Sequence, residues 1–164
     1  MHRYGNKKYS QGIVVDTAMF FRSLTKRHFA LFPYLSEALT HLRKKYRIAV
    51  ISDAQWVFAE PEIEMLGLDR FFTLRILSSC FGFKKPDVRL FTIAMGKFGV
   101  RPEESIYVGD NPNKDLLGAK RAGMKFLFFG EEFQEYQEHN ALKPDGIFSD
   151  YSELEEVVSG EFHS

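Results

Sequence analysis

Cysteine is almost absent from this chain, because Cys80 is the only one among 164 residues. An internal disulfide is therefore excluded, and so is a small fold held together by a disulfide framework. A single thiol fits a reducing compartment, and we expect a cytoplasmic protein. We also expect Cys80 to be a small residue of the hydrophobic core.

Long hydrophobic runs and a net charge are also lacking. No stretch approaches the roughly 18 to 20 apolar residues that cross a membrane, and residues 1–8 lack the apolar centre of a signal peptide. The 22 Lys and Arg residues balance 22 Asp and Glu residues, so the charge gives no reason to expect nucleic acid or an anionic membrane as a partner. The 17 phenylalanines have no accompanying basic stripe, which predicts packing rather than base stacking.

Internal repeats and linkers are missing as well, and the 45% apolar content is enough for one hydrophobic core. Short apolar runs alternate with amphipathic segments along most of the chain. This alternation predicts an α/β fold with a mostly parallel sheet covered by helices on both faces. The runs predict strands over 48–51, 74–77, 106–108, 126–129 and 147–148, and the amphipathic segments predict helices from residue 35 to 42, over 56–66, from 86 to 98, over 116–122 and after 152.

Polar residues follow the predicted strands directly. Ser52-Asp53 follows the first strand, Lys84-Lys85 lies in the loop beyond the second, and Gly109-Asp110 ends the third. Ligands bind outside the carboxyl ends of the strands in parallel sheets, so these residues are the candidates for a site. A hydroxyl, a lysine and carboxylates can together hold a phosphoryl group and a hard divalent cation.

Three segments, in this order, resemble signatures of the haloacid dehalogenase (HAD) superfamily. Residues 48–53 resemble the second signature, a strand that ends in Ser or Thr, and Lys85-Pro86-Asp87 resembles the third. Residues 108–124 closely resemble the fourth, in which Gly-Asp and a second Asp precede Gly-Ala and Ala-Gly. The resemblance implies a Rossmannoid three-layer HAD-like core, with the cap domain absent or reduced to an N-terminal helix.

The resemblance also implies a role for each site residue. Ser52 and Lys85 would be catalytic, and Ser52, Asp53 and Lys85 would bind the phosphoryl group. Asp110 would ligate Mg²⁺ directly, and Asp115 would support the metal site. Phosphoryl transfer depends mainly on positioning and charge neutralisation, which suits these residue types.

The first HAD signature, an apolar strand that ends in Asp-x-Asp, is degenerate or missing. Its only candidate is Ile13-Val14-Val15-Asp16-Thr17-Ala18, in which Ala18 replaces the general acid/base. The alternative is a helix over residues 14–28 that resembles the last helix of a cap domain. We therefore divide the chain into an N-terminal segment, 1–30, that is a cap remnant or a degenerate first strand, and a HAD-like core, 31–164.

The function expected from this pattern is that of a magnesium-dependent phosphatase of a small phosphorylated metabolite. The alternative is a truncated or non-catalytic HAD core that binds phosphate and Mg²⁺ without turnover. A phospho-acceptor receiver domain uses similar residue types, but it places its acidic residues before the hydroxyl and the lysine. Here Asp110 and Asp115 follow Ser52 and Lys85, so the order argues against a receiver.

Overall fold

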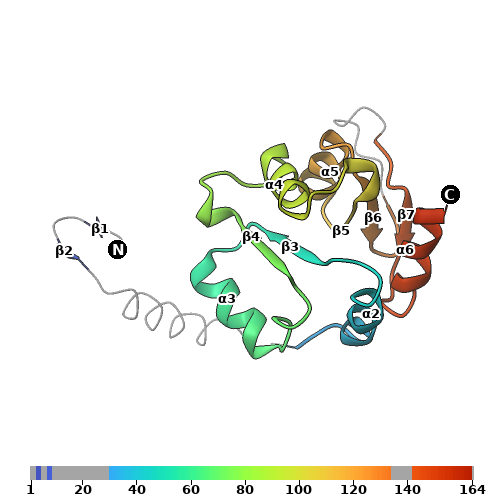
Figure 1. The fold of residues 1–164 in the computed structure, drawn as a ribbon, viewed down its shortest axis with the longest axis horizontal. Coiled ribbons are helices and arrows are strands. Elements are labelled where there is room, and N and C mark those ends of the chain that lie inside the picture. Colours follow the sequence, from blue (N-terminus) through green and yellow to red (C-terminus); the bar gives the residue numbers. More distant parts are fainter. Residues whose placement is uncertain (1–2, 5–6, 9–29, 134–141, 164) are drawn as a thin grey trace.

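The computed structural model describes residues 3–4, 7–8, 30–133 and 142–163, and it shows an α/β fold (Figure 1). The strands of the core are β3 (Ala49–Ser52), β4 (Leu74–Leu77), β5 (Ile106–Gly109), β6 (Lys125–Phe129) and β7 (Gly146–Phe148). The helices are α2 (Leu35–Leu42), α3 (Trp56–Met65), α4 (Val88–Phe98), α5 (Leu117–Arg121) and α6 (Leu154–His163). Short helical turns are η1 (Ser78–Cys80), η2 (Pro102–Glu104) and the π-helical η3 (Pro112–Leu116), and β1 (Arg3–Tyr4) pairs antiparallel with β2 (Lys7–Lys8).

Local sequence signals set the ends of helix α4. The carboxylate of Asp87 accepts a hydrogen bond from the Arg89 N–H and so caps the first turn. The helix ends at Gly99, whose φ of 62° lies in the left-handed region that glycine adopts without strain. The α/β alternation predicted from the sequence is confirmed.

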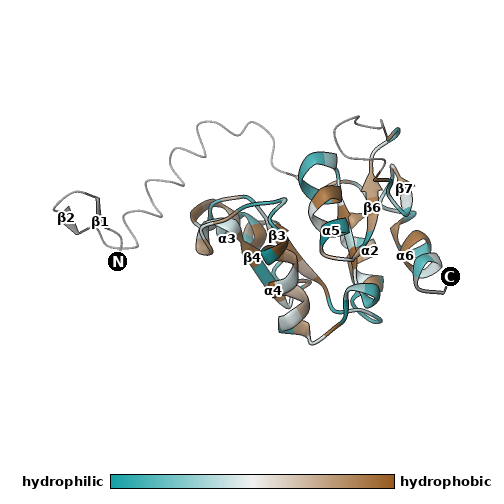
Figure 2. Ribbon diagram, turned by 90° about the horizontal axis from the view of Figure 1, so that it is seen from above, coloured by the Kyte–Doolittle hydropathy of each residue, from teal (hydrophilic) through white to brown (hydrophobic). Residues whose placement is uncertain are grey.

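Strand β6 shows how the core is layered, because its side chains alternate between two hydrophobic clusters. Phe126 and Phe128 point to one face, where they join residues of α4 and α5. Leu127 points to the other face, where it packs with residues of α2 and α6. The two views of the ribbon agree with this arrangement (Figures 1 and 2). The predicted covering of the sheet on both faces is thus present.

The parallel ladder is interrupted between β3 and β5. Among the residues described, β3 pairs only with β4, whereas β5, β6 and β7 form a separate parallel ladder. Figure 1 shows β3 and β5 as neighbouring strands with no strand drawn between them. The carboxyl ends of β3 and β5 nevertheless approach the same side-chain cluster, because the Tyr107 hydroxyl lies 3.3 Å from the Ile51 carbonyl oxygen.

One expectation about the core is wrong. Cys80 is exposed in η1 instead of buried, because the turn after β4 carries it to the surface. The expected packing role holds for Phe126, which is fully buried, but Phe81 is 39% exposed. Ile13 to Ala18 and the proposed helix over 14–28 lie outside the described residues. In the described part of the chain, every helix is too short or too polar to cross a membrane.

Candidate functional site

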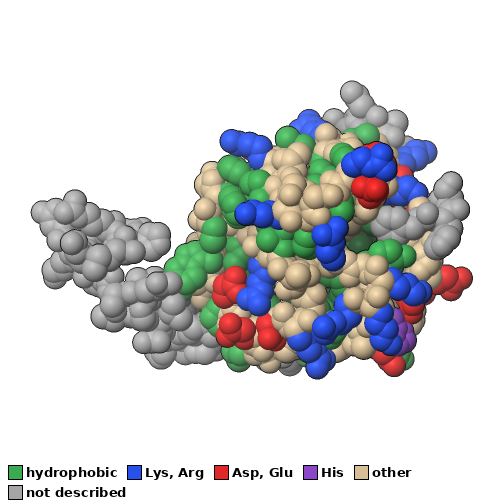
Figure 3. Space-filling view, in the orientation of Figure 1, with side chains coloured by type: hydrophobic (Ala, Val, Ile, Leu, Met, Phe, Trp, Pro, Cys, Tyr) green, Lys and Arg blue, Asp and Glu red, His purple; other side chains and the backbone are tan. Residues whose placement is uncertain are grey.

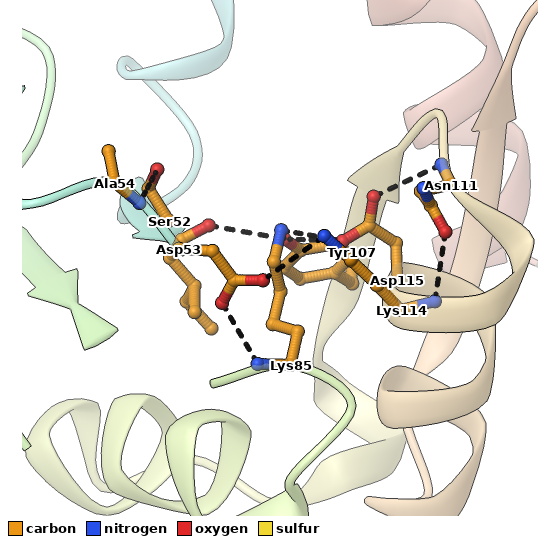
Figure 4. Close-up of polar contacts among 9 residues, drawn as sticks. Ser52, Asp53, Ala54, Lys85, Tyr107, Asn111, Lys114 and Asp115 are labelled. Atoms are coloured by element: carbon orange, nitrogen blue, oxygen red, sulfur yellow. Dashed lines mark hydrogen bonds and ion pairs between the residues drawn. The ribbon is translucent and has the colours of Figure 1, made fainter. Parts of the chain in front are cut away.

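The site begins at the carboxyl end of β3, where the chain turns sharply after Ser52. The Ser52 Oγ accepts a hydrogen bond of 3.1 Å from the Ala54 N–H. The Asp53 Oδ1 accepts one of 2.9 Å from the backbone N–H of Lys85, which ties the loop after β4 to the end of β3 (Figure 4). The Asp53 Oδ2 is buried without a hydrogen-bond partner, and the Lys114 Nζ lies 3.7 Å from it.

The Lys85 ammonium group lies at the centre of the site. Its Nζ is 2.6 Å from the Asp115 Oδ1 and donates a hydrogen bond of 3.0 Å to the Tyr107 hydroxyl. The side chains of Lys85 and Asp115 are only 12% and 4% exposed. Burial alone would lower the pKa of Lys85, but the contacts with Tyr107 and Asp115 outweigh burial and raise this pKa above its usual value. Lys85 therefore carries a fixed positive charge at neutral pH.

Asp115 reaches this position through an unusually wide first helical turn. The Asn111 carbonyl accepts hydrogen bonds from the N–H groups of Lys114, Asp115 and Leu116, the last of which defines the π-helical turn η3. The Asp115 Oδ2 in turn accepts a hydrogen bond of 3.1 Å from the Asn111 N–H. Gly109 permits this close approach, since a Cβ at that position would lie 2.7 Å from the Asp115 Cβ. π-Turns recur at functional sites in other proteins.

Tyr107 connects the two ladders, a role that the sequence did not indicate. Its hydroxyl lies 3.3 Å from both the Ile51 carbonyl oxygen and the Asp115 Oδ1. Its ring packs edge-on against Phe91, with 5.0 Å between the centroids. Burial is the main cause that raises the pKa of Tyr107 to about 12, so the phenol is neutral when it receives the lysine hydrogen bond.

Asp110 differs from Asp115 in its surroundings. It follows Gly109 directly and is exposed to solvent. Burial and the negative charge of Asp110 together raise the pKa of Tyr151, which places this carboxylate on the side of the site near Tyr151. In contrast, the Oδ1 of Asp115 contacts Lys85 and Tyr107, and its Oδ2 accepts the hydrogen bond from the Asn111 N–H.

The donors available for a divalent cation are carboxylate oxygens, which suit Mg²⁺. Within residues 30–133 and 142–163, no group of three His, Cys, Asp or Glu side chains surrounds a common point. Mg²⁺ is nevertheless often held by one or two carboxylates together with waters and substrate phosphates. The exposed carboxylate of Asp110, directly after β5, is a donor of this kind.

Four of the residues singled out in the sequence, Ser52, Asp53, Lys85 and Asp115, lie together at one edge of the sheet. Direct contacts join Asp53 to Lys85 and Lys85 to Asp115, and Ser52 precedes Asp53 at the end of β3. Asn111, Lys114 and Tyr107 belong to the same cluster (Figure 4). The Asn-Pro that opens the π-turn was a possible signal for Asn111, but an aromatic residue inside an apolar strand gave none for Tyr107.

Comparison with known proteins gives a family and a set of relatives. The family model for haloacid dehalogenase-like hydrolases matches residues 5–129. A glyceraldehyde 3-phosphate phosphatase from Methanothermobacter thermautotrophicus is 33% identical over 132 residues, which are 77% of this chain and 58% of that protein. A phosphoserine phosphatase from Thermus thermophilus is 36% identical over 110 residues, which are 66% of this chain and 43% of that protein. The chain thus spans about half the length of these curated relatives.

A solved structure extends the likeness to three dimensions. The crystal structure of a predicted phosphoglycolate phosphatase from Haemophilus somnus superposes with a TM-score of 0.73 and 25% identity. The superposition covers 85% of this chain and 63% of that one.

Proposed function

Because the chain belongs to the haloacid dehalogenase-like hydrolase family, we propose that it is the phosphate- and magnesium-binding core of a phosphatase. Its substrate would be a small phosphorylated metabolite, as the names of the relatives suggest. One observation carries the proposal. The Lys85 ammonium is held between Tyr107 and Asp115, at the edge where Ser52 and Asp53 end β3.

Each group has a definite part in this proposal. The Ser52 Oγ already accepts a hydrogen bond from Ala54, which leaves its hydrogen free for a phosphoryl oxygen. The Lys85 ammonium would neutralise charge on the phosphoryl group, since it is fixed in place and needs no reorganisation. Asp53 would hold the Lys85 loop in register through the hydrogen bond to its backbone.

Asp110 is the carboxylate that we propose as a direct ligand of Mg²⁺, because it is exposed at the end of β5. Both oxygens of Asp115 are engaged with Lys85, Tyr107 and Asn111, so we propose that Asp115 supports the metal site by holding these groups in place. Bound Mg²⁺ would neutralise phosphate charge, as it does in other phosphoryl-transfer sites.

Turnover is a separate question from binding. Asp16 is the candidate nucleophile, and Ala18 stands where a general acid/base would be expected. Loss of acid/base help alone typically removes about 10²- to 10⁴-fold in rate. We therefore propose that the isolated chain hydrolyses phosphomonoesters very slowly, and the alternative is a non-catalytic core that binds phosphate without turnover.

The experiment that tests the proposal is calorimetric titration of inorganic phosphate in the presence of Mg²⁺. We expect the wild type to bind phosphate and Lys85→Met to lose this binding. Lys120→Met is the matched control, because Lys120 also pairs with a carboxylate, that of Asp145, and this pair contains none of the site residues. Absence of binding by the wild type, or equal binding by Lys85→Met, would refute the proposal.

A second assay separates the two alternatives. Hydrolysis of p-nitrophenyl phosphate is measured for the wild type and for Asp16→Asn, purified identically. Slow turnover that disappears in Asp16→Asn would identify Asp16 as the nucleophile. Equal background rates, combined with phosphate binding, would support the non-catalytic core.

A further inference from the structure

Lys114 brings a second ammonium group to the site, and this group is only loosely paired. Its Nζ lies 3.7 Å from the Asp53 Oδ2, which is too far for a hydrogen bond. The Lys85 Nζ, in comparison, lies 2.6 Å from the Asp115 Oδ1. An ammonium group has three N–H donors. Within the part of the chain that the structure describes, the three donors of Lys114 therefore have no acceptor at hydrogen-bond distance.

The backbone of Lys114 is fixed, whereas its side chain is held only by this long ion pair. The Lys114 N–H donates a hydrogen bond of 3.1 Å to the side-chain oxygen of Asn111, within the π-turn η3 that also positions Asp115. The Lys114 side chain is 49% exposed, and Figure 4 shows it extending from η3 toward Asp53. The ammonium group can therefore move within the site without any rearrangement of the backbone.

Asp53 offers Lys114 an oxygen that itself lacks a partner. The Asp53 Oδ1 accepts the hydrogen bond from the Lys85 N–H, whereas the Oδ2 is buried without a hydrogen bond from any described residue. A buried carboxylate oxygen without a hydrogen bond is unfavourable. An anionic ligand that drew the ammonium group a short way into the site would let one donor reach Asp53 and another reach the ligand. Both contacts would then be charge-assisted hydrogen bonds, typically about 2.7–2.9 Å long.

The charge of the site makes a second ammonium group useful to an anionic ligand. The site has three carboxylates, those of Asp53, Asp110 and Asp115, but only two lysines, Lys85 and Lys114. A phosphomonoester carries between one and two negative charges near neutral pH, so the carboxylates repel it. Lys85 is already paired with Asp115 at 2.6 Å. Lys114 is thus the lysine whose charge a ligand can engage without breaking a short ion pair.

We propose that Lys114 is a second anion-recognising lysine of the site, which binds an anionic oxygen of a phosphorylated ligand while it bridges to Asp53. The inference rests on the proposed function, because it concerns the ligand of the same site. The anionic oxygen belongs to the phosphoryl group itself or to a carboxylate attached to it. The chemistry of recognition is the same in both cases, and two ligands distinguish them.

Calorimetric titration of the full chain with inorganic phosphate and with 2-phosphoglycolate, each in the presence of Mg²⁺, tests the inference. Lys114→Met should weaken binding by roughly 5- to 10-fold, as expected for a charged contact that is half exposed. Lys114→Arg should retain binding, because the positive charge remains. Lys97→Met is the matched control, since it removes the same charge. Lys97 lies in the last turn of α4, roughly 14 Å along the helix from Val88, where α4 begins next to the site.

Weaker binding of both ligands by Lys114→Met would place Lys114 on the phosphoryl group, and weaker binding of 2-phosphoglycolate alone would place it on the carboxylate. Either result supports the inference. Equal affinities of the wild type and Lys114→Met for both ligands would overturn it and leave the proposed function intact, whereas absence of binding by the wild type would overturn both. A purely structural role of Lys114 predicts that the Met and Arg variants both bind weakly and both melt below the wild type without ligand. That result would also overturn the inference.

Discussion

Gly109→Ala should destabilise the protein because the site leaves no room for a methyl group at the end of β5. The added Cβ would lie 2.7 Å from both the Cβ and the Oδ2 of Asp115, and 2.8 Å from its Cγ. Asp115 cannot simply retreat, since Lys85 and Asn111 hold its two oxygens. Either β5 or the turn η3 must therefore move.

The magnitude follows from the two ways in which this strain can be relieved. Overpacking of a well-filled interior costs about 1–3 kcal/mol. A shift large enough to separate Asp115 from Lys85 would bring the loss closer to the roughly 3–5 kcal/mol of a broken buried ion pair. We expect the free energy of unfolding to fall by about 2–4 kcal/mol.

Gly96→Ala is the matched control. It makes the same chemical change, but we expect it to raise the free energy of unfolding instead of lowering it. Gly96 is exposed in the last turn of α4, and a Cβ there would meet nothing within 4 Å. Replacing a helical glycine by alanine should stabilise by about 0.5–1 kcal/mol. Urea unfolding followed by far-UV circular dichroism measures both changes. A Gly109→Ala variant within about 0.5 kcal/mol of the wild type would refute the reasoning, since changes of this size are ordinary for unconstrained surface positions.

Three further predictions concern the phenol, a charged group away from the site and the metal. Tyr107→Phe should lower the free energy of unfolding by about 0.5–1.5 kcal/mol, because it removes the hydroxyl that contacts Lys85, Asp115 and the Ile51 carbonyl, whereas Tyr151→Phe should change it little in the same urea assay. Burial alone would raise the pKa of Asp145, but hydrogen bonds from Lys120 and the Phe126 N–H lower it below the usual 3.8. The stability that Asp145 contributes is therefore fully present above pH 3.8 and is lost as the pH falls below that value. Between about pH 5 and pH 2 the free energy of unfolding should consequently fall less for Asp145→Asn than for the wild type. Parallel plots of the free energy of unfolding against pH for the two proteins would contradict this. Mg²⁺ should raise the melting temperature of the wild type and of Asp69→Asn but not that of Asp110→Asn, and equal shifts in all three would count against Asp110 as a ligand.

The sequence predicted the elements whose limits depend on neighbouring residues. Strand β4 covers Leu74–Leu77 as predicted, and α4 lies between the cap at Asp87 and the left-handed Gly99. These signals are local, because a cap or a left-handed glycine acts within one helical turn. Cys80 shows the limit of such signals. An apolar residue next to a strand was expected in the core, but the turn η1 places it at the surface.

The sequence predicted which residues form the site, but not which of them contact one another. The sequence singled out Ser52, Asp53, Lys85 and Asp115, and these residues do lie at one edge of the sheet. It could not show that both oxygens of Asp115 are engaged, because that depends on the π-turn and on Tyr107 from another element. Contacts between residues far apart in the sequence have no local signature.

The distribution of charge on the surface does not favour long-range electrostatic attraction of an anionic substrate, so binding would depend on the residues of the site itself. The face shown in Figure 3 has Lys and Arg side chains mixed with Asp and Glu, without one continuous basic patch. With equal numbers of charged residues of each sign overall, the long-range attraction for an anionic substrate is weak. A phosphate would therefore have to be recognised at close range by a charge that is already fixed in place.

The ammonium group of Lys85, which is buried in an ion pair with Asp115, is such a charge. The contribution of this ion pair to the stability of the fold does not by itself explain why the pair is buried there. Removing two charges from water costs several kcal/mol per ion, and their attraction often only offsets this cost. Two apolar residues of similar volume would therefore stabilise the fold about as well. The pair lies at the carboxyl edge of the sheet, shares the hydroxyl of Tyr107 and connects to the end of β3 through Asp53. A pre-oriented ammonium group there contributes little to folding, but under the proposed function it would help to hold a phosphoryl group.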